Sequence, residues 1–256
     1  MKKKVLLIFL CLILLSACSH TYYAPNVVPS PHLMNKGNVD LRANIISPVG
    51  QGSDFSAFEL SGSYSPVKNV AVMSNLFYGF ASKDNGKNNG YILDLAAGGY
   101  LPFDLNKEKM ANRREELSLS GFLGTSFGSA FNTFDTIGNV TSKLNFNRYF
   151  ACVGASYLVQ KFKLGVGFRY NYLQFLSSSR NVGAIPAVEL TSISNIEEQT
   201  SFQFPEMSLS LGLDLRKFYF VWGLTRSYVN QPEKYHFNNS NLYMTVGVNL
   251  HEFFKK

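Results

Sequence analysis

Few residues of this chain have side chains that could carry out catalysis. Beyond residue 37, the histidines are His236 and His251. His236 lies near Glu233 and Ser240, and a histidine that contacts a carboxylate and a hydroxyl could activate the hydroxyl for hydrolysis. The sequence has no metal-ligand spacing, phosphate-binding glycine loop or nucleotide motif. We expect no catalytic residues, no metal and no cofactor, and we expect that the chain is not an enzyme. A hydrolase based on His236 is the less favoured alternative.

A second group of reactive side chains consists of charged residues in segments of alternating polarity. Arg42, Glu59, Asp94 and Arg169 each lie between apolar neighbours. A turn at residues 50–51 would put Arg42 opposite Glu59 on neighbouring strands, where opposite charges pair. In the interior of a closed sheet such a pair would replace water, and Asp94 and Arg169 would join it. We predict a lumen charge cluster of these four residues. A selectivity point in a channel is the alternative role.

The elements that position these residues are predicted to be strands. From residue 39 onward apolar residues return at every second position, which is typical of strands with one apolar face. The opposite face carries mostly Gly, Ser, Thr and Asn, which are small enough to fill a narrow lumen, whereas a water-facing exterior would carry many Lys and Glu. We therefore expect the apolar face to contact lipid. The ten segments are 39–45, 58–64, 70–79, 91–101, 117–123, 149–157, 162–172, 206–215, 218–224 and 242–250.

The lengths of the connections predict which end of the sheet is external, because transmembrane barrels alternate short turns with longer external loops. Residues 102–116 break the alternation, since a long and charged segment stands where a turn is expected. Residues 187–190 could add a strand, so twelve strands is an alternative to ten. The short turns are 65–69, 160–161 and 216–217, and the long loops are 80–90, 125–147, 175–204 and 229–241.

The first residues predict export. Three lysines at 2–4 precede an apolar run at 5–15 that is too short to span a membrane, as in a secretion signal. The segment closes with Leu15-Ser16-Ala17-Cys18, which resembles the lipobox of bacterial lipoproteins. The resemblance implies a signal peptide at 1–17 and a lipid such as palmitate on Cys18. Cleavage removes three lysines and no acidic residue, so the formal net charge of +7 falls to +4, and we expect no nucleic-acid partner.

The mature chain divides into two parts. Residues 18–37 contain Pro25, Pro29 and Pro31 and lack periodicity, which predicts a lipidated N-terminus followed by a flexible tether. Residues 38–256 are expected to form a single barrel domain. Cys152 is the one cysteine left for that domain, so we expect no disulfide within it.

With these features the chain resembles the small bacterial outer-membrane β-barrel proteins, in a lipid-anchored variety. The resemblance implies an all-β fold, namely an antiparallel up-and-down transmembrane β-barrel that contacts the lipid of the outer membrane of a Gram-negative bacterium. The residues after Cys18 are Ser19-His20-Thr21-Tyr22, without the acidic residues that some surface-displayed lipoproteins carry there. The lipid anchor is therefore expected on the periplasmic side.

The function that we expect is a structural one. Ten strands enclose a lumen that side chains largely fill, because only wider barrels leave an open aqueous path. We expect a structural or accessory subunit of an envelope complex, with an envelope protein as its partner. The alternatives are a narrow channel, a ligand-binding transport barrel, and an outer-membrane hydrolase.

Overall fold

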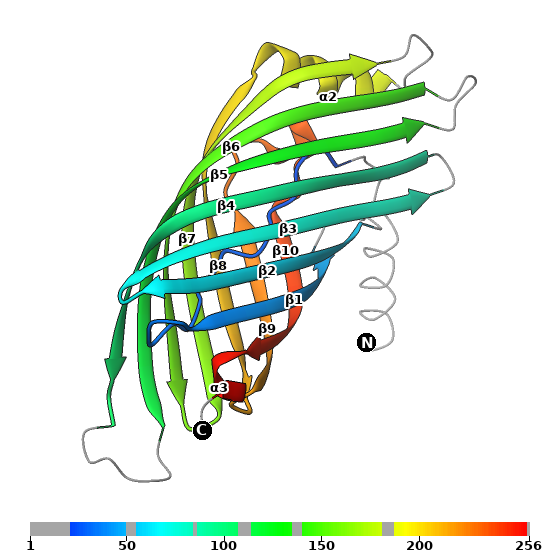
Figure 1. Ribbon diagram of the computed structural model, residues 1–256. Helices are drawn as coiled ribbons and strands as arrows, with labels where there is room; N and C mark the ends of the chain where they lie inside the picture. Colours follow the sequence, from blue (N-terminus) through cyan, green and yellow to red (C-terminus); the bar gives the residue numbers. More distant parts are fainter. Residues whose placement is uncertain are drawn as a thin grey trace, which may run out of the picture.

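The computed structural model describes residues 21–49, 55–83, 86–106, 114–134, 140–180 and 187–254. Within these residues ten antiparallel strands close into one barrel, in which each strand pairs with its neighbours in sequence and β1 pairs with β10 (Figure 1). The strands are β1 (Val39–Pro48), β2 (Ser56–Val67), β3 (Val70–Lys83), β4 (Gly86–Asp104), β5 (Glu115–Phe134), β6 (Val140–Val159), β7 (Phe162–Arg180), β8 (Ser201–Asp214), β9 (Phe218–Ser227) and β10 (Ser240–Asn249). The predicted all-β, up-and-down barrel of ten strands is confirmed.

The alternative of twelve strands is wrong, because the residues in question are helical. Residues 187–190 begin the helix α2 (Ala187–Glu198), which lies between β7 and β8. Ile193 and Ile196 are three positions apart, so they share one helix face, and both are 1% exposed. Among the described residues, none of the helices is long and apolar enough to cross a membrane.

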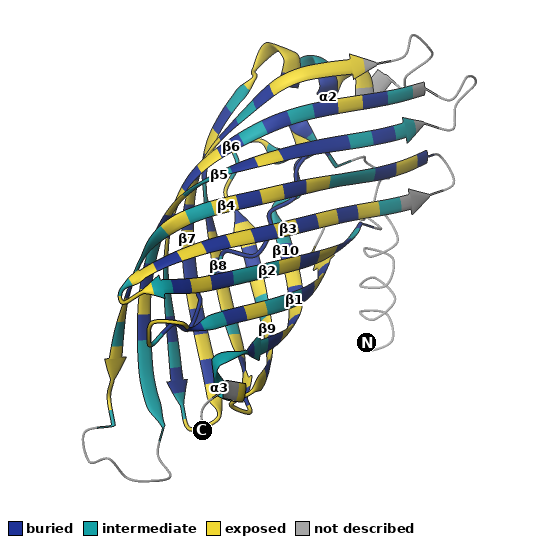
Figure 2. Cartoon of the chain, in the orientation of Figure 1, coloured by how far each residue is buried: buried dark blue, intermediate teal, exposed yellow. Residues whose placement is uncertain are grey.

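The strands have the two unlike faces that their alternating sequence predicts. On β8, Glu206 and Ser208 are at most 3% exposed and point into the barrel, whereas Leu209 and Leu211 are about half exposed on the outside. Figure 2 shows this alternation of buried and exposed residues along the front strands. An exterior made of exposed Leu, Val, Phe and Tyr side chains is stable in lipid rather than in water. The molecule is an outer-membrane β-barrel with a lipid environment.

The two ends of the barrel differ in their connections. Three short turns lie at one end, and in each a residue with positive φ, namely Asn69, Gln160 or Arg216, reverses the chain. The same end holds the start of β1 and the helix α3 (His251–Phe254). We call it the turn end, and the opposite end, with α2 and the 3-10 helix η1 (Pro232–Tyr235), the loop end. In outer-membrane barrels the short turns are periplasmic and the long loops external.

One connection at the turn end is longer than a turn. Strand β4 ends at Asp104 and β5 begins at Glu115, so both strands extend further than the alternating pattern predicts. Residues 107–113, which include most of the charged segment, lie outside the described residues. Arg114 is described, and its guanidinium pairs with Glu116 at 3.0 Å and with Asp214 at 3.3 Å. These ion pairs tie the end of this connection to β5 and β8.

Candidate functional site in the lumen

The lumen is occupied by the chain's own N-terminal segment. Residues 21–37, which we call the plug, precede β1: residues 21–34 run inside the barrel, where Tyr22, Val28 and Leu33 are at most 1% exposed, and residues 35–37 are exposed at the turn end. In Figure 1 the plug is the dark blue trace seen inside the barrel before β1. The expectation of a flexible tether is wrong for this segment. Proline lacks a backbone N–H, so the three prolines reduce the number of donors that an extended chain must satisfy inside a barrel.

Asn26 of the plug stands at the centre of the lumen network. Its amide Nδ2 donates to Asp94 Oδ2 at 2.6 Å, and its Oδ1 accepts from Arg169 Nη2 at 2.6 Å and from Arg148 Nη1 at 3.1 Å. Asn26, Arg148 and Arg169 are each at most 1% exposed. One plug side chain therefore uses both its donor and its acceptor on charged groups from β4, β6 and β7.

The charges around Asn26 balance one another. Arg148 Nη2 pairs with Asp94 Oδ1 at 2.6 Å, and Arg169 Nε donates to Glu206 Oε2 at 2.7 Å. Tyr23 of the plug joins this network, since its hydroxyl donates to Glu206 and accepts from Arg148. Two arginines thus face two carboxylates whose side chains are at most 2% exposed, which is the arrangement that makes buried charge tolerable.

Glu59 also holds the plug rather than pairing with an arginine. Its Oε2 accepts from the backbone N–H of Val27 at 3.0 Å, and its Oε1 accepts from Asn44 Nδ2 at 2.6 Å. Arg42 lies opposite Ser61, and Asn44 lies opposite Glu59. The predicted Arg42–Glu59 pair is therefore wrong. The actual hairpin register is displaced by two residues, so both side chains still point inward.

Arg42 has a different partner near the turn end. Its Nη2 pairs with Asp40 Oδ2 at 2.6 Å and donates to the carbonyl oxygen of Ser30 in the plug at 3.0 Å. Asp40 also accepts hydrogen bonds from the Tyr219 hydroxyl and from the backbone N–H of His32. The four residues of the predicted charge cluster all face the lumen. The structure brings Asp94 and Arg169 into one network, 3.8 Å apart, and leaves Arg42 with Asp40.

His32 of the plug forms the arrangement nearest to a hydrolytic site. Its Nδ1 lies 3.2 Å from Ser156 Oγ, and its Nε2 lies 2.8 Å from Glu116 Oε2. A serine, a histidine and a carboxylate in a row are the groups of a nucleophilic relay. Ser156 is only 1% exposed, however, so a substrate carbonyl cannot reach its Oγ in this structure. In this state the three residues fix the plug to β5 and β6.

His236, the histidine that the sequence suggested for hydrolysis, contacts the N-terminal end of the plug at Tyr22. Its carbonyl oxygen accepts from the backbone N–H of Tyr22 at 3.0 Å, and the rings of His236 and Tyr22 stack with centroids 6.3 Å apart. Phe237 pairs with Tyr23 in a short parallel bridge. The loop-end aromatic cluster that surrounds them consists of Tyr22, Tyr23, Phe146, Phe175, Phe202, Phe204, Tyr235 and Phe237. His251 lies at the opposite end of β10, where it pairs with Glu252 at 3.0 Å.

Glycines in the barrel wall make room for the plug. A Cβ at Gly154 would lie 2.9 Å from the carbonyl oxygen of Pro29, and one at Gly167 would lie 2.9 Å from Val28 Cγ1. Both distances are shorter than a real Cβ contact. Glycine inside a strand often marks a close approach of another backbone, and here that backbone is the plug.

Sequence reasoning missed the residues that hold the plug, chiefly Asn26, Arg148 and Glu206. The signal that could have found two of them is charge at lumen-facing positions, because Glu206 begins the predicted strand 206–215 and Arg148 directly precedes the predicted strand 149–157. Cys152 is buried and free. Cys18, the predicted lipidation site, lies outside the described residues.

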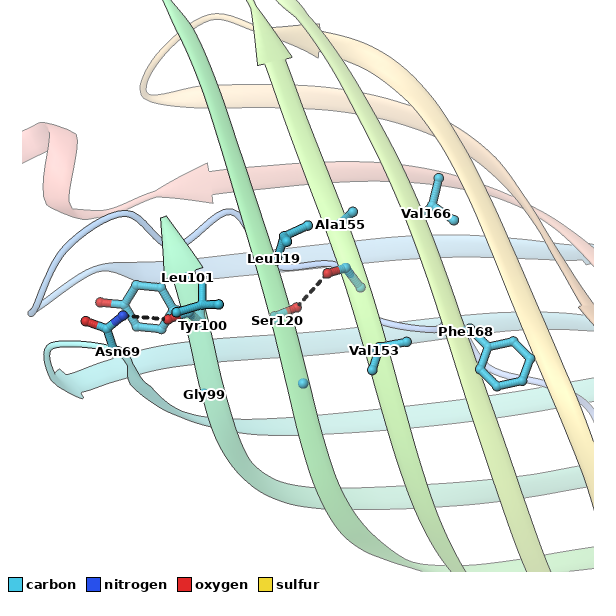
Figure 3. Close-up of a pocket in the computed structure, with 12 residues that line it drawn as sticks. Asn69, Gly99, Tyr100, Leu101, Leu119, Ser120, Val153, Ala155, Val166 and Phe168 are labelled. Carbon is cyan, nitrogen blue, oxygen red and sulfur yellow. Dashed lines mark hydrogen bonds between the residues drawn. The ribbon is translucent and has the colours of Figure 1, made fainter. Parts of the chain in front are cut away.

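Grooves of about 680, 800 and 810 Å³ lie on the outer wall. One groove of about 680 Å³ lies beside the β2–β3 turn, where Gly99, Gly121 and Ala155 leave space between larger apolar side chains (Figure 3). Tyr100 and Ser120 behind it point to the lumen and are at most 7% exposed. The groove faces the bilayer and has no charged residue in its lining, so acyl chains suit it better than a polar substrate. Among the described residues, no group of three or more potential ligands could hold a metal ion.

Comparisons with known proteins find the barrel fold and no closer relationship. No protein-family model matches the sequence, and no curated protein matches it. LpxR from Salmonella typhimurium is similar in structure over 82% of this chain and 99% of its own, with 7% identity and a TM-score of 0.40. An outer membrane channel from Pseudomonas putida F1 matches over 87% of this chain and 99% of its own, with 11% identity and a TM-score of 0.36. Neisserial surface protein A matches over 83% and 94%, with 12% identity and a TM-score of 0.33.

The exclusion of enzymatic activity must be corrected in view of these structures. Barrels of this kind include an outer-membrane enzyme, LpxR, as well as channels. The expectation that the chain is not an enzyme rested on the scarcity of catalytic side chains and motifs, and it is wrong to exclude catalysis for a fold that enzymes share. At these identities the similarity concerns the fold alone.

Proposed function

We propose that the chain is a structural or accessory subunit of an envelope complex and that its lumen is closed to solutes while the plug is bound. The observation that supports this proposal is the buried plug. A ten-stranded barrel has a lumen that side chains largely fill, and the plug fills the space that remains around Asn26 and Arg148, both 0% exposed. When the lumen is closed, the loops and the outer wall are the surfaces that can contact other molecules.

The loop end offers an ordered surface for a protein partner. The helices α2 and η1 form a cap there: the Tyr235 hydroxyl donates to Gln199 Oε1 at 2.7 Å, and Asn195 Nδ2 donates to the carbonyl oxygen of Lys234 at 3.3 Å. Leu190 of α2 is 42% exposed on this cap. A surface that is ordered before binding loses less conformational entropy when a partner binds. We therefore propose the cap as the partner's contact site.

Affinity purification tests the proposal. We expect the tagged protein, extracted from native membranes in mild detergent, to carry an envelope protein in stoichiometric amount. Leu190→Ser should reduce the amount of that protein, whereas Leu105→Ser, which changes an exposed leucine at the turn end, should leave it unchanged. A barrel that purifies alone from wild-type membranes would contradict the proposal.

A narrow channel is the second candidate, because the wall behind the plug is polar. Asn75, Ser126 and Thr245 are at most 5% exposed and face the lumen, so the lumen could fill with water if the plug left it. This candidate predicts ion conductance by the full chain in a planar bilayer. An inserted protein without ion conductance would contradict the channel. Steady conductance would contradict the closed lumen of our proposal.

We also propose that the chain is a lipoprotein. Residues 1–17 would be cleaved as a signal peptide, Cys18 would carry the lipid, and residues 38–256 would form the barrel domain. The match of Leu15-Ser16-Ala17-Cys18 to a lipobox supports this proposal. Mass spectrometry of the mature N-terminal peptide should show a diacylglyceryl group on Cys18, and Cys18→Ser should abolish it. An unmodified Cys18 would contradict the proposal.

A further inference from the structure

The plug crosses the lumen in a defined direction. At the turn end, the N–H of Gly37 donates to the carbonyl oxygen of Ser65 at 2.8 Å, directly before β1 begins. At the loop end, the N–H of Tyr22 donates to the carbonyl oxygen of His236 at 3.0 Å. Proceeding from β1 toward the N-terminus, the chain therefore passes from the turn end to the loop end of the barrel.

The chain reaches the rim of the lumen at Thr21. The carbonyl oxygen of Thr21 accepts from Asn88 Nδ2 of β4 at 2.8 Å, and Thr21 is partly exposed, whereas Tyr22 is buried. Asn88 lies two residues from the start of β4 at Gly86, where β4 pairs with the end of β3 at Lys83, so Thr21 lies close to the loop end of this hairpin. On the outer wall of these strands Tyr78, Phe80 and Tyr91 are nearly half exposed, as expected of an aromatic belt at the level of the lipid headgroups.

We propose that the mature N-terminus is displayed at the external face of the outer membrane, with the acyl chains of Cys18 in the outer leaflet. The argument rests on the proposed lipidation and on the reach of the chain. Three residues separate Cys18 from Thr21, and an extended chain of three residues spans at most about 10 Å. The apolar band of an outer-membrane barrel is about 25 Å tall. Cys18 therefore cannot reach the periplasmic leaflet while Thr21 remains at the loop end.

This topology replaces the periplasmic anchor that the sequence suggested. That expectation rested on the absence of acidic residues directly after Cys18 and took no account of a segment that crosses the lumen. For the anchor to be periplasmic, the plug would have to leave the lumen and give up the hydrogen bonds of Tyr23, Asn26 and Val27 to buried carboxylates. A lipid in the outer leaflet would instead hold the plug from outside, while β1 holds it at the turn end.

Accessibility of an epitope on intact cells tests this proposal. One variant carries the epitope between Ser19 and His20, and a matched control carries it after Lys256, in the sequence that follows α3 of the turn end. We expect antibody to label the first variant on intact cells and the control only after permeabilisation. Labelling of both variants only after permeabilisation would overturn the proposal. A disulfide in the tagged double variant Tyr22→Cys/His236→Cys would verify that the epitope has not displaced the plug.

The lipid is tested separately in the same tagged protein. Mass spectrometry of the N-terminal peptide should show the acyl chains on Cys18. An exposed epitope on an unmodified Cys18 would overturn the lipid part of the proposal and the lipoprotein proposal with it, while the external position of the N-terminus would stand. A modified Cys18 with a hidden epitope would overturn the topology alone.

Discussion

The lumen face and the lipid face of the same strands meet different demands. On β6, Arg148 is 0% exposed and contacts Ser126, Tyr23, Asn26 and Asp94, whereas the next residue, Tyr149, is 49% exposed on the outer wall. An outer side chain needs only to suit its level in the membrane: it is apolar where it contacts acyl chains and amphipathic at the membrane boundary. The inner one needs particular partners at particular distances. The apolar side chains of the lipid face therefore determine the fold, whereas the polar side chains of the lumen face determine how the plug is bound.

The largest expected effect follows from removing one charge of the lumen. Arg148→Met would leave Asp94 without its closest cation, and breaking a buried ion pair costs about 3–5 kcal/mol. The measurement is denaturant unfolding in lipid vesicles, followed by fluorescence of Trp222, the one tryptophan of the chain. The neighbouring Tyr149→Phe is the control and should unfold like the wild type. Equal midpoints for all three proteins would show that the lumen network adds nothing to stability.

The plug side of the same network can be broken without removing a charge. Asn26→Leu keeps the approximate volume and loses three hydrogen bonds to charged groups. One such bond contributes about 1.5–3 kcal/mol, and we expect a loss of at least that size, because Asp94, Arg148 and Arg169 keep their ion pairs. Protease digestion of the N-terminal segment in vesicles should become faster as well, because the plug is held less tightly. Met34→Leu, which conserves volume in the plug, serves as the control. An Asn26→Leu plug as resistant as that of Met34→Leu would contradict the central role of Asn26.

Replacing one glycine by alanine on each face compares the two faces with a single added methyl group. Gly154→Ala would push against Pro29 and Ser30 of the plug, where the new Cβ would lie 2.9 Å and 3.1 Å from their atoms. Overpacking of this kind costs about 1–3 kcal/mol. Gly121→Ala, on the lipid face, would place its Cβ no closer than 3.9 Å to any neighbour and should be neutral. The unfolding midpoints of the two variants measure the difference, and a reversed order would refute the close approach of the plug.

Much of the fold could be predicted from the sequence, and for a physical reason. Lipid demands an apolar residue at every second position, so strands such as residues 162–172, within the observed β7, carry a local signal. Both members of the predicted Arg42–Glu59 pair face the lumen for the same reason. The prediction that they pair is wrong because the register depends on the length of the hairpin connection. An alternation of period two is unchanged when one strand shifts by two residues, so it does not determine the register.

The plug could not be predicted in the same way. Its prolines and its lack of periodicity are typical of a linker, and its partners come from distant parts of the chain: Asn26 and Arg169 are 143 positions apart. A single extended segment has no repeating pattern that marks which face is buried. Its role depends on the wall that surrounds it, and that wall exists only when ten strands have closed.

The smallest expected effect concerns adjacent residues of β5 that point in opposite directions. Leu123 is 72% exposed on the outer wall, and Phe122 is 3% exposed in the lumen. Leu123→Val exchanges one lipid-facing aliphatic group for another, so its unfolding free energy should change by less than about 0.5 kcal/mol. Phe122→Leu should cost more, because Phe122 packs with Tyr100, Phe150 and Cys152 in the second buried cluster of the lumen. If Leu123→Val were the more damaging of the two, the outer wall would be a packed interface at this point, and a protein rather than lipid would have to cover β5.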